Sequence, residues 1–180
     1  MSLSAEQRED FAAYVQNPDT WLFACHRNLA VARLLMKVAD EQLLKPKSDF
    51  FERVGCFYSS YFHAALALEN AAKAVYVSNG EIVVSGEKLK FPESFGRSGH
   101  ALMRPLVALL GDLTEFEQSL VTKLEEFGWA GRYSVPMNAK ALYDQKKMQI
   151  MRTSSSDELP IVESLVDRLV APLARPGSVA

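Results

Sequence analysis

Apolar side chains recur along most of this chain at alternating steps of three and four residues, which is the spacing of one face of an α-helix. Ser4 and Gln7 have capping-box spacing and predict a short helix that ends at Asn17-Pro18, and a longer helix follows over residues 20–44. The longer helix carries a core-facing stripe of apolar and small residues: Leu22, Cys25, Leu29, Ala32, Met36, Ala39 and Leu43.

A second long helix is expected after Pro46, which breaks the first one. Asp49 and Glu52 have capping-box spacing, and Asn79-Gly80 is typical of a helix C-terminus. Because only a short connection joins the two long helices, we expect them to form an antiparallel hairpin at the centre of the fold. The stripe of the second helix is Phe51, Val54, Tyr58, Tyr61, Ala65, Leu68, Ala72 and Val75.

Three more helices are predicted in the second half of the chain. The first begins near His100 and ends at Gly111. The second has capping-box spacing at Asp112 and Glu115, and Gly128 is expected to close it. Its stripe is Leu113, Phe116, Leu120, Leu124 and Phe127. The last helix carries Ile161, Leu165, Val166, Leu169, Val170 and Leu173.

Together these elements predict an all-α fold, an up-and-down bundle of about five to six helices. The helical spacing is lost over residues 81–98, where EIVV and KLKF flank SGE, and this pattern fits a small hairpin or an irregular excursion. Residues 138–153 stay ambiguous. A length of 180 residues with 48% hydrophobic content predicts a single domain, residues 1–180, with its core at about residues 20–173.

The composition narrows the class of protein. A net charge of -2 argues against unspecific binding to phosphate backbones, which depends on concentrated Lys and Arg. No apolar run reaches about 18 residues and no secretion signal opens the chain, so we expect a cytoplasmic protein without a membrane partner. Cys25 and Cys56 have no C-x-x-C spacing and are expected to be small buried side chains.

A search for catalytic patterns returns none of the common ones. The sequence has no G-x-S-x-G, Walker loop or G-x-G-x-x-G. His26, His63 and His100 lie on different segments without H-E-x-x-H spacing, so we expect neither a metal site nor a cofactor, and the catalytic residues, if there are any, stay unknown.

Five residues are candidates for anion or nucleotide binding, or for fixing a loop: Glu69, Lys73, His100, Arg132 and Tyr133. Glu69 and Lys73 are four residues apart in the favourable order, which fits a partly exposed helical ion pair. Alternatively, Glu69 is buried and pairs with Arg132. His100 stands at the expected start of a helix, where the amides favour an anion, although a capping or loop-fixing role is the simpler one.

The segments YFHAALALENAAKAVYVSNG, GHALMRPLVALL and GRYSVP resemble those of a HEPN domain in their spacing and in their order along the chain. These are helical domains of bacteria and archaea, often dimeric, found as toxins, as partners of nucleotidyltransferases and in phage defence. The resemblance covers about residues 20–173. Its Ala-x-x-x-Glu-x-x-x-Lys core matches Ala65, Glu69 and Lys73, its Gly-His-x-Leu matches Gly99, His100 and Leu102, and its Arg-Tyr-x-x-Pro matches Arg132, Tyr133 and Pro136.

One departure from this family concerns catalysis. HEPN ribonucleases carry an Arg-x(4–6)-His motif, usually on the last core helix, whereas no histidine follows Arg168 here. The pairs Arg97 with His100 and Arg53 with His63 have the wrong spacing. The metal-independent RNA cleavage that the resemblance implies is therefore in doubt.

Three interpretations follow. The first is a HEPN-like binding or partner module that forms a homodimer and has a protein, nucleotide or RNA partner. Its setting is a toxin–antitoxin or phage-defence system, and we expect a non-enzyme rather than an enzyme. The second is a divergent HEPN ribonuclease that uses Arg132, His100 or His63, and it predicts that a histidine and an arginine converge in a cleft at a dimer interface. The third is a helical scaffold with no small-molecule site.

Overall fold

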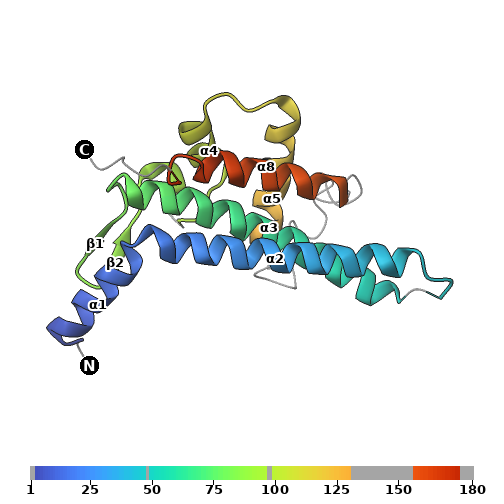
Figure 1. Ribbon diagram of the computed structural model, residues 1–180, viewed down its shortest axis with the longest axis horizontal. Helices are drawn as coiled ribbons and strands as arrows, with labels where there is room; N and C mark the ends of the chain where they lie inside the picture. Colours follow the sequence, from blue (N-terminus) through green and yellow to red (C-terminus); the bar gives the residue numbers. More distant parts are fainter. Residues whose placement is uncertain (1–2, 48, 97–98, 131–155, 175–180) are drawn as a thin grey trace, which may run out of the picture.

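The computed structural model describes residues 3–47, 49–96, 99–130 and 156–174, and over these residues the chain is all-α apart from one small hairpin (Figure 1). The predicted fold class is confirmed. The six described α-helices are α1 (Ala5–Val15), α2 (Pro18–Leu43), α3 (Phe50–Ser78), α4 (Met103–Leu110), α5 (Glu115–Ala130) and α8 (Leu159–Val170). Two 3-10 turns are η1 (Glu93–Phe95) and η2 (Ser156–Glu158).

Helix α3 is the centre of the bundle. It runs antiparallel to α2 along the length of both helices, and α5 and α8 pack against it from other sides (Figure 1). The predicted caps of the hairpin are present: the Asp49 carboxylate accepts from the amides of Phe51 and Glu52, and Asn79 ends the helix. A helix covered on several sides needs small side chains for close approach, and α3 contains a run of buried alanines: Ala64, Ala65, Ala67, Ala71, Ala72 and Ala74.

The predicted stripes form the core, with exceptions at the helix ends. Cys25, Leu29, Tyr61 and Leu68 are buried in one cluster with residues of α5 and α8. Three expected core residues are instead exposed, namely Leu43, Phe51 and Phe116. Leu43 and Phe51 lie at the tip of the α2–α3 hairpin, which extends beyond α5 and α8 in Figure 1, so neither of these two helices covers them there.

The segment after α3 forms a small hairpin, which is one of the two alternatives expected for it. Strands β1 (Val83–Ser85) and β2 (Lys88–Lys90) pair antiparallel, with Val84 opposite Leu89. After β2 the chain turns back through η1, whose Phe95 is fully buried against Tyr76 of α3. This return brings the following segment onto the surface of α3.

Both predicted boundaries of α5 are wrong. The capping box of α5 consists of Thr114 and Glu117, not Asp112 and Glu115, because the amides of Thr114 and Glu117 each bond the other residue's side chain. Gly128 does not close α5, which continues to Ala130. A Cβ added at Gly128 would lie 3.6 Å from that of Ala65, so this glycine marks the close packing of α5 on α3 rather than a helix end.

The end of α4 was also predicted from the sequence. Gly111, with a φ of 75°, ends α4 as predicted. The ambiguous residues 138–153 lie outside the described part of the chain. Within the described ranges, no helix has both the length and the apolar character that crossing a membrane requires.

Candidate functional site

Three of the five candidate residues lie together at one face of α3. Glu69 and Lys73 are one helical turn apart, and Lys73 Nζ lies 2.6 Å from Glu69 Oε1. His100 does not begin a helix as predicted. It precedes α4 by three residues, and its Nδ1 lies 2.9 Å from the same Glu69 oxygen. The Glu69 carboxylate therefore joins a helical lysine to a histidine that lies 31 residues after Glu69 in the chain.

The Glu69–Lys73 ion pair is buried, so the expectation of a partly exposed pair is wrong and the burial of Glu69 given by the alternative is confirmed. The exposed fractions of the two side chains are 9% and 5%, whereas His100 is 33% exposed. Burial follows from the return of the chain through β2 and η1, which covers this face of α3. A buried ion pair requires good geometry and further polar contacts to offset the cost of removing both charges from water, and His100 supplies one such contact.

Aromatic rings surround the Lys73 ammonium. Its Nζ lies 4.7 Å from the ring centroid of Phe91, 5.3 Å from that of Trp21 and 5.9 Å from that of Phe95. These contacts come from α2, the segment after β2 and η1, so a single ammonium joins three parts of the chain through cation–π attraction. We call Glu69, Lys73, His100, Trp21, Phe91 and Phe95 the lysine cluster.

Gly99 determines how closely this segment approaches the ring of Phe91. Its φ is 72°, and a Cβ at this position would lie 3.0 Å from Cδ2 of Phe91. Both the left-handed backbone and the close ring exclude an ordinary side chain. The Gly-His pair of the sequence motif therefore combines a glycine that admits the Phe91 ring with a histidine that bonds Glu69.

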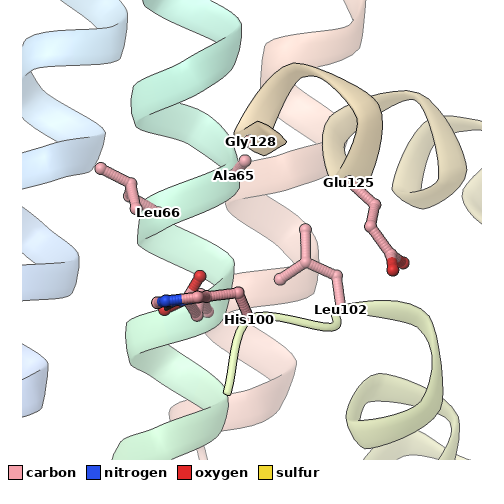
Figure 2. Close-up of a pocket in the computed structure, with 7 residues that line it drawn as sticks. Ala65, Leu66, His100, Leu102, Glu125 and Gly128 are labelled. Carbon is pink, nitrogen blue, oxygen red and sulfur yellow. Dashed lines mark hydrogen bonds and ion pairs between the residues drawn. The ribbon is translucent and has the colours of Figure 1, made fainter. Parts of the chain in front are cut away.

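A small pocket lies beside the lysine cluster, between α3, the segment before α4, and α5 (Figure 2). Figure 2 shows His100 extending across α3, while Glu125 comes from α5 on the other side. Glu125 accepts a hydrogen bond of 3.3 Å from the Met103 amide and so caps α4, whose N-cap residue Leu102 has no polar side chain. The pocket is lined by Ala65, Leu66, Glu69, His100, Leu102, Glu125 and Gly128.

The chemistry of the pocket favours fixing the loop over binding an anion. A phosphate in it would face two carboxylates, those of Glu69 and Glu125, and the Lys73 ammonium already contacts Glu69 and three rings. Within the described ranges, no group of three or more His, Cys, Asp or Glu side chains is arranged to hold a metal ion. Arg132 and Tyr133 lie outside the described residues, so their pairing with this site stays a prediction.

A second buried ion pair was not anticipated from the sequence. Lys123 Nζ of α5 lies 2.5 Å from Glu158 Oε1 at the start of α8, and the Tyr61 hydroxyl of α3 donates to the other Glu158 oxygen. Lys123 and Glu158 are both buried. The available signal was a lysine directly before Leu124 in an apolar stretch, but nothing in the sequence indicated its partner 35 residues away.

A third polar group joins His63 of α3 to Asn28 of α2. Asn28 donates through its amide nitrogen to the Ala24 carbonyl, so its oxygen faces His63 Nδ1 at 2.9 Å. Nδ1 therefore carries the proton and donates, which leaves Nε2 as an acceptor. Burial, and to a lesser degree the positive charge of Arg27, lower the pKa of His63. Arg27 is exposed and makes no ion pair with the residues that the structure describes.

The two cysteines differ in how deeply they are buried. Cys25 is completely buried, as predicted, and burial followed by the nearby charge of Asp167 raises the pKa of its thiol to about 12. Cys56 is only half-buried, which corrects the expectation for it, because it lies towards the exposed tip of α3. A thiol with so high a pKa is almost entirely protonated at neutral pH, so Cys25 is a packing residue rather than a nucleophile.

Comparison of the chain with protein-family models, with curated proteins and with solved structures gave no match. The likeness to HEPN domains therefore depends on the quoted segments alone. The position of Glu69, Lys73 and His100 in one cluster is a structural observation, whereas their membership in a HEPN motif stays an expectation.

Proposed function

We propose that this chain is a HEPN-like helical binding or partner module that acts as a homodimer, in the toxin–antitoxin or phage-defence setting that the resemblance implies. Binding, rather than catalysis, is its activity in this proposal. Its partner is a macromolecule that contacts its surface, a protein or an RNA, and the lysine cluster serves to hold the segment before α4 in place.

One observation carries this proposal. The polar residues that the resemblance singles out, as far as they are described, are bonded to one another, with Glu69 and Lys73 buried. Large apolar side chains are meanwhile exposed, among them Leu44 at 84% and Phe51 at 85%. A catalytic centre needs reactive groups that reach a substrate, whereas a binding module needs exposed side chains that a partner can cover.

A thermal-shift panel of nucleotides, short single-stranded RNAs and simple anions tests the module, with Arg132→Ala measured beside the wild type. If RNA or a nucleotide is the partner, a concentration of about 100 Kd raises stability by about 2.7 kcal/mol and the melting temperature by about 5–10 °C. Recovered RNA should be intact after incubation in a chelator. Cleaved RNA would contradict the module, and no response with a less stable Arg132→Ala would favour a scaffold or a protein partner.

The group around His63 favours a second candidate function, the divergent ribonuclease. His63 was one of the histidines proposed for that role, and burial, followed by the positive charge of Arg27, lowers its pKa. Asn28 fixes the tautomer of His63 so that Nε2 is an acceptor. A base held in one orientation, with an exposed guanidinium that acts on it electrostatically, fits a general base and a charge-stabilising group for attack on a phosphodiester.

In this candidate reaction, His63 Nε2 removes the proton from the 2'-hydroxyl of a ribose. The 2'-oxygen then attacks the adjacent phosphorus while the guanidinium of Arg27 stabilises the negative charge, and the 5'-oxygen leaves with a proton from water. The products are a 2',3'-cyclic phosphate and a 5'-hydroxyl end. Incubation of labelled RNA with wild type, His63→Gln and His26→Gln tests it: His63→Gln should lose about 100-fold or more in rate, while His26→Gln should cleave normally. Equal rates in all three would contradict it.

A further inference from the structure

The tip of the α2–α3 hairpin carries an apolar patch that the fold leaves uncovered. We call Leu43, Leu44, Phe50 and Phe51 the tip patch; their exposed fractions are 62%, 84%, 57% and 85%. The rings of Phe50 and Phe51 meet edge to face at a centroid distance of 5.7 Å. Figure 1 shows the tip projecting beyond the ends of α5 and α8.

The tip patch continues the core stripes of both helices. Leu43 follows Met36 and Ala39 at the helical spacing, and both of these residues are buried. On the other helix, Phe51 stands seven residues before Tyr58, which packs against the core. The sequence therefore specifies core-type residues for one more layer than the described helices cover, and this is the pattern expected where a second molecule supplies the missing side.

The size of the tip patch fits a symmetric dimer. A Phe or Leu side chain at these exposed fractions leaves somewhat more than 100 Å² uncovered, so the four together expose on the order of 500 Å². Two copies packed tip to tip would bury about 1,000 Å², which is the area that separates specific interfaces from chance contacts. An exposed apolar patch of this size is often functional.

The charges around the tip patch favour a second copy over other partners. Three acidic residues (Glu41, Asp49 and Glu52) and three basic ones (Lys45, Lys47 and Arg53) lie within residues 41–53, so the local net charge is zero. In a two-fold interface each surface faces its own copy, and a patch with both signs is self-complementary. An anionic lipid surface would instead be repelled by Asp49 and Glu52, which flank the exposed phenylalanines.

We propose that the tip patch is the surface through which two copies of this chain associate. This inference rests on the proposed homodimeric module and identifies its interface. The two helix ends at the tip are already held in place within one chain, which suits them to association with a second copy. Asp49 caps α3, and Gln42 donates to Glu52 across the hairpin. The patch is therefore presented on a preorganised support.

The oligomeric state of Phe51→Glu tests the inference, with Leu34→Glu as the matched control. Phe51 is in the first turn of α3, where a carboxylate is favourable, so the variant should fold. Leu34 is 62% exposed on the middle of α2, away from the tip patch. Analytical ultracentrifugation at micromolar concentrations should give twice the 20.1 kDa chain mass for the wild type and Leu34→Glu, and the single-chain mass for Phe51→Glu.

A monomeric wild type would overturn the inference, and so would a dimer that survives Phe51→Glu but not Leu34→Glu. Sedimentation of a monomeric wild type with phosphatidylserine vesicles, lost in Phe51→Glu, would assign the tip patch to a lipid surface and also overturn it. The RNA panel described above is independent of this result. A monomer that still binds RNA without cleaving it would therefore refute the tip interface while leaving the binding activity intact.

Discussion

Two buried ion pairs occur within the described residues, and they differ in how far apart their partners lie along the sequence. Glu69 and Lys73 are neighbours on one helix, and His100 joins them from a segment that folds over that helix. Lys123 and Glu158 belong to different helices, and Tyr61 adds a third. The first pair fixes a loop to α3, and the second connects three helices of the core.

The two ion pairs also differ in what is expected when one of their charges is removed. The lysine cluster has a partly exposed edge at His100, where water can compensate when one member is lost. The Lys123–Glu158 pair has no such edge among its described members, since both side chains are almost completely buried. Removing one charge there leaves the other in a medium of low polarity. We therefore expect the two pairs to respond differently to the same kind of substitution.

The largest effect is expected for Lys123→Met, which leaves the Glu158 carboxylate with the Tyr61 hydroxyl as its described partner. The free energy of unfolding should fall by about 3–5 kcal/mol, measured by urea denaturation. The double variant Lys123→Met with Glu158→Gln removes both charges and keeps an acceptor for Tyr61, so it should recover most of the loss. A cost below about 1 kcal/mol for the single variant would show that the pair does not support the core.

Lys73→Met should cost less, about 2 kcal/mol, because Glu69 keeps His100 and the thioether can still pack among the rings. Urea denaturation of this variant and of Lys123→Met under identical conditions gives the comparison directly. Arg27→Met is a suitable control, since it removes an exposed cation on α2. If Lys73→Met proved more destabilising than Lys123→Met, the distinction between the two pairs would fail.

His100→Ala should have a local effect of about 1 kcal/mol, since it removes one hydrogen bond to a buried carboxylate. Hydrogen exchange should become faster at the Ala101 amide, which bonds the Phe95 carbonyl, while the amides in the middle of α8 keep their protection. His100→Gln retains a donor and should lie close to the wild type. Uniformly faster exchange throughout the core would show that His100 does more than hold this segment.

The smallest effect is expected at the surface ion pair between Arg168 of α8 and Glu117 of α5, which joins two of the helices that Glu158 joins inside. Hydrogen bonds from the Thr114 amide and hydroxyl, together with the charge of Arg168, lower the pKa of Glu117 from its usual 4.5. The stability it contributes is thus present above that value and is lost as the pH falls through the lowered pKa. Glu117→Gln should cost at most about 1 kcal/mol at pH 7, with the difference vanishing in acid denaturation curves. A difference that grew towards low pH would contradict this sign.

The sequence was informative where a pattern depends on residues close along the chain. The capping box at Ser4, the cap at Asp49 and the Glu69–Lys73 spacing are all local, and all three are present in the structure. Local rules failed where two of them competed. Thr114 displaced Asp112 as the cap of α5, and Gly128 was assigned to a helix end although it lies where two helices approach closely.

What the sequence by itself determined is the class of fold and the position of its long helices, because helical spacing and caps are set by neighbouring residues. Only the tertiary structure decided that the Glu69–Lys73 pair is buried, that Lys123 faces Glu158, and that Leu43 and Phe51 are exposed although their spacing places them on core stripes. The physical reason is that burial and long-range pairing depend on which other segment covers a residue. The covering segment is decided by how whole helices pack. The residue's neighbours in the chain carry no information about that packing.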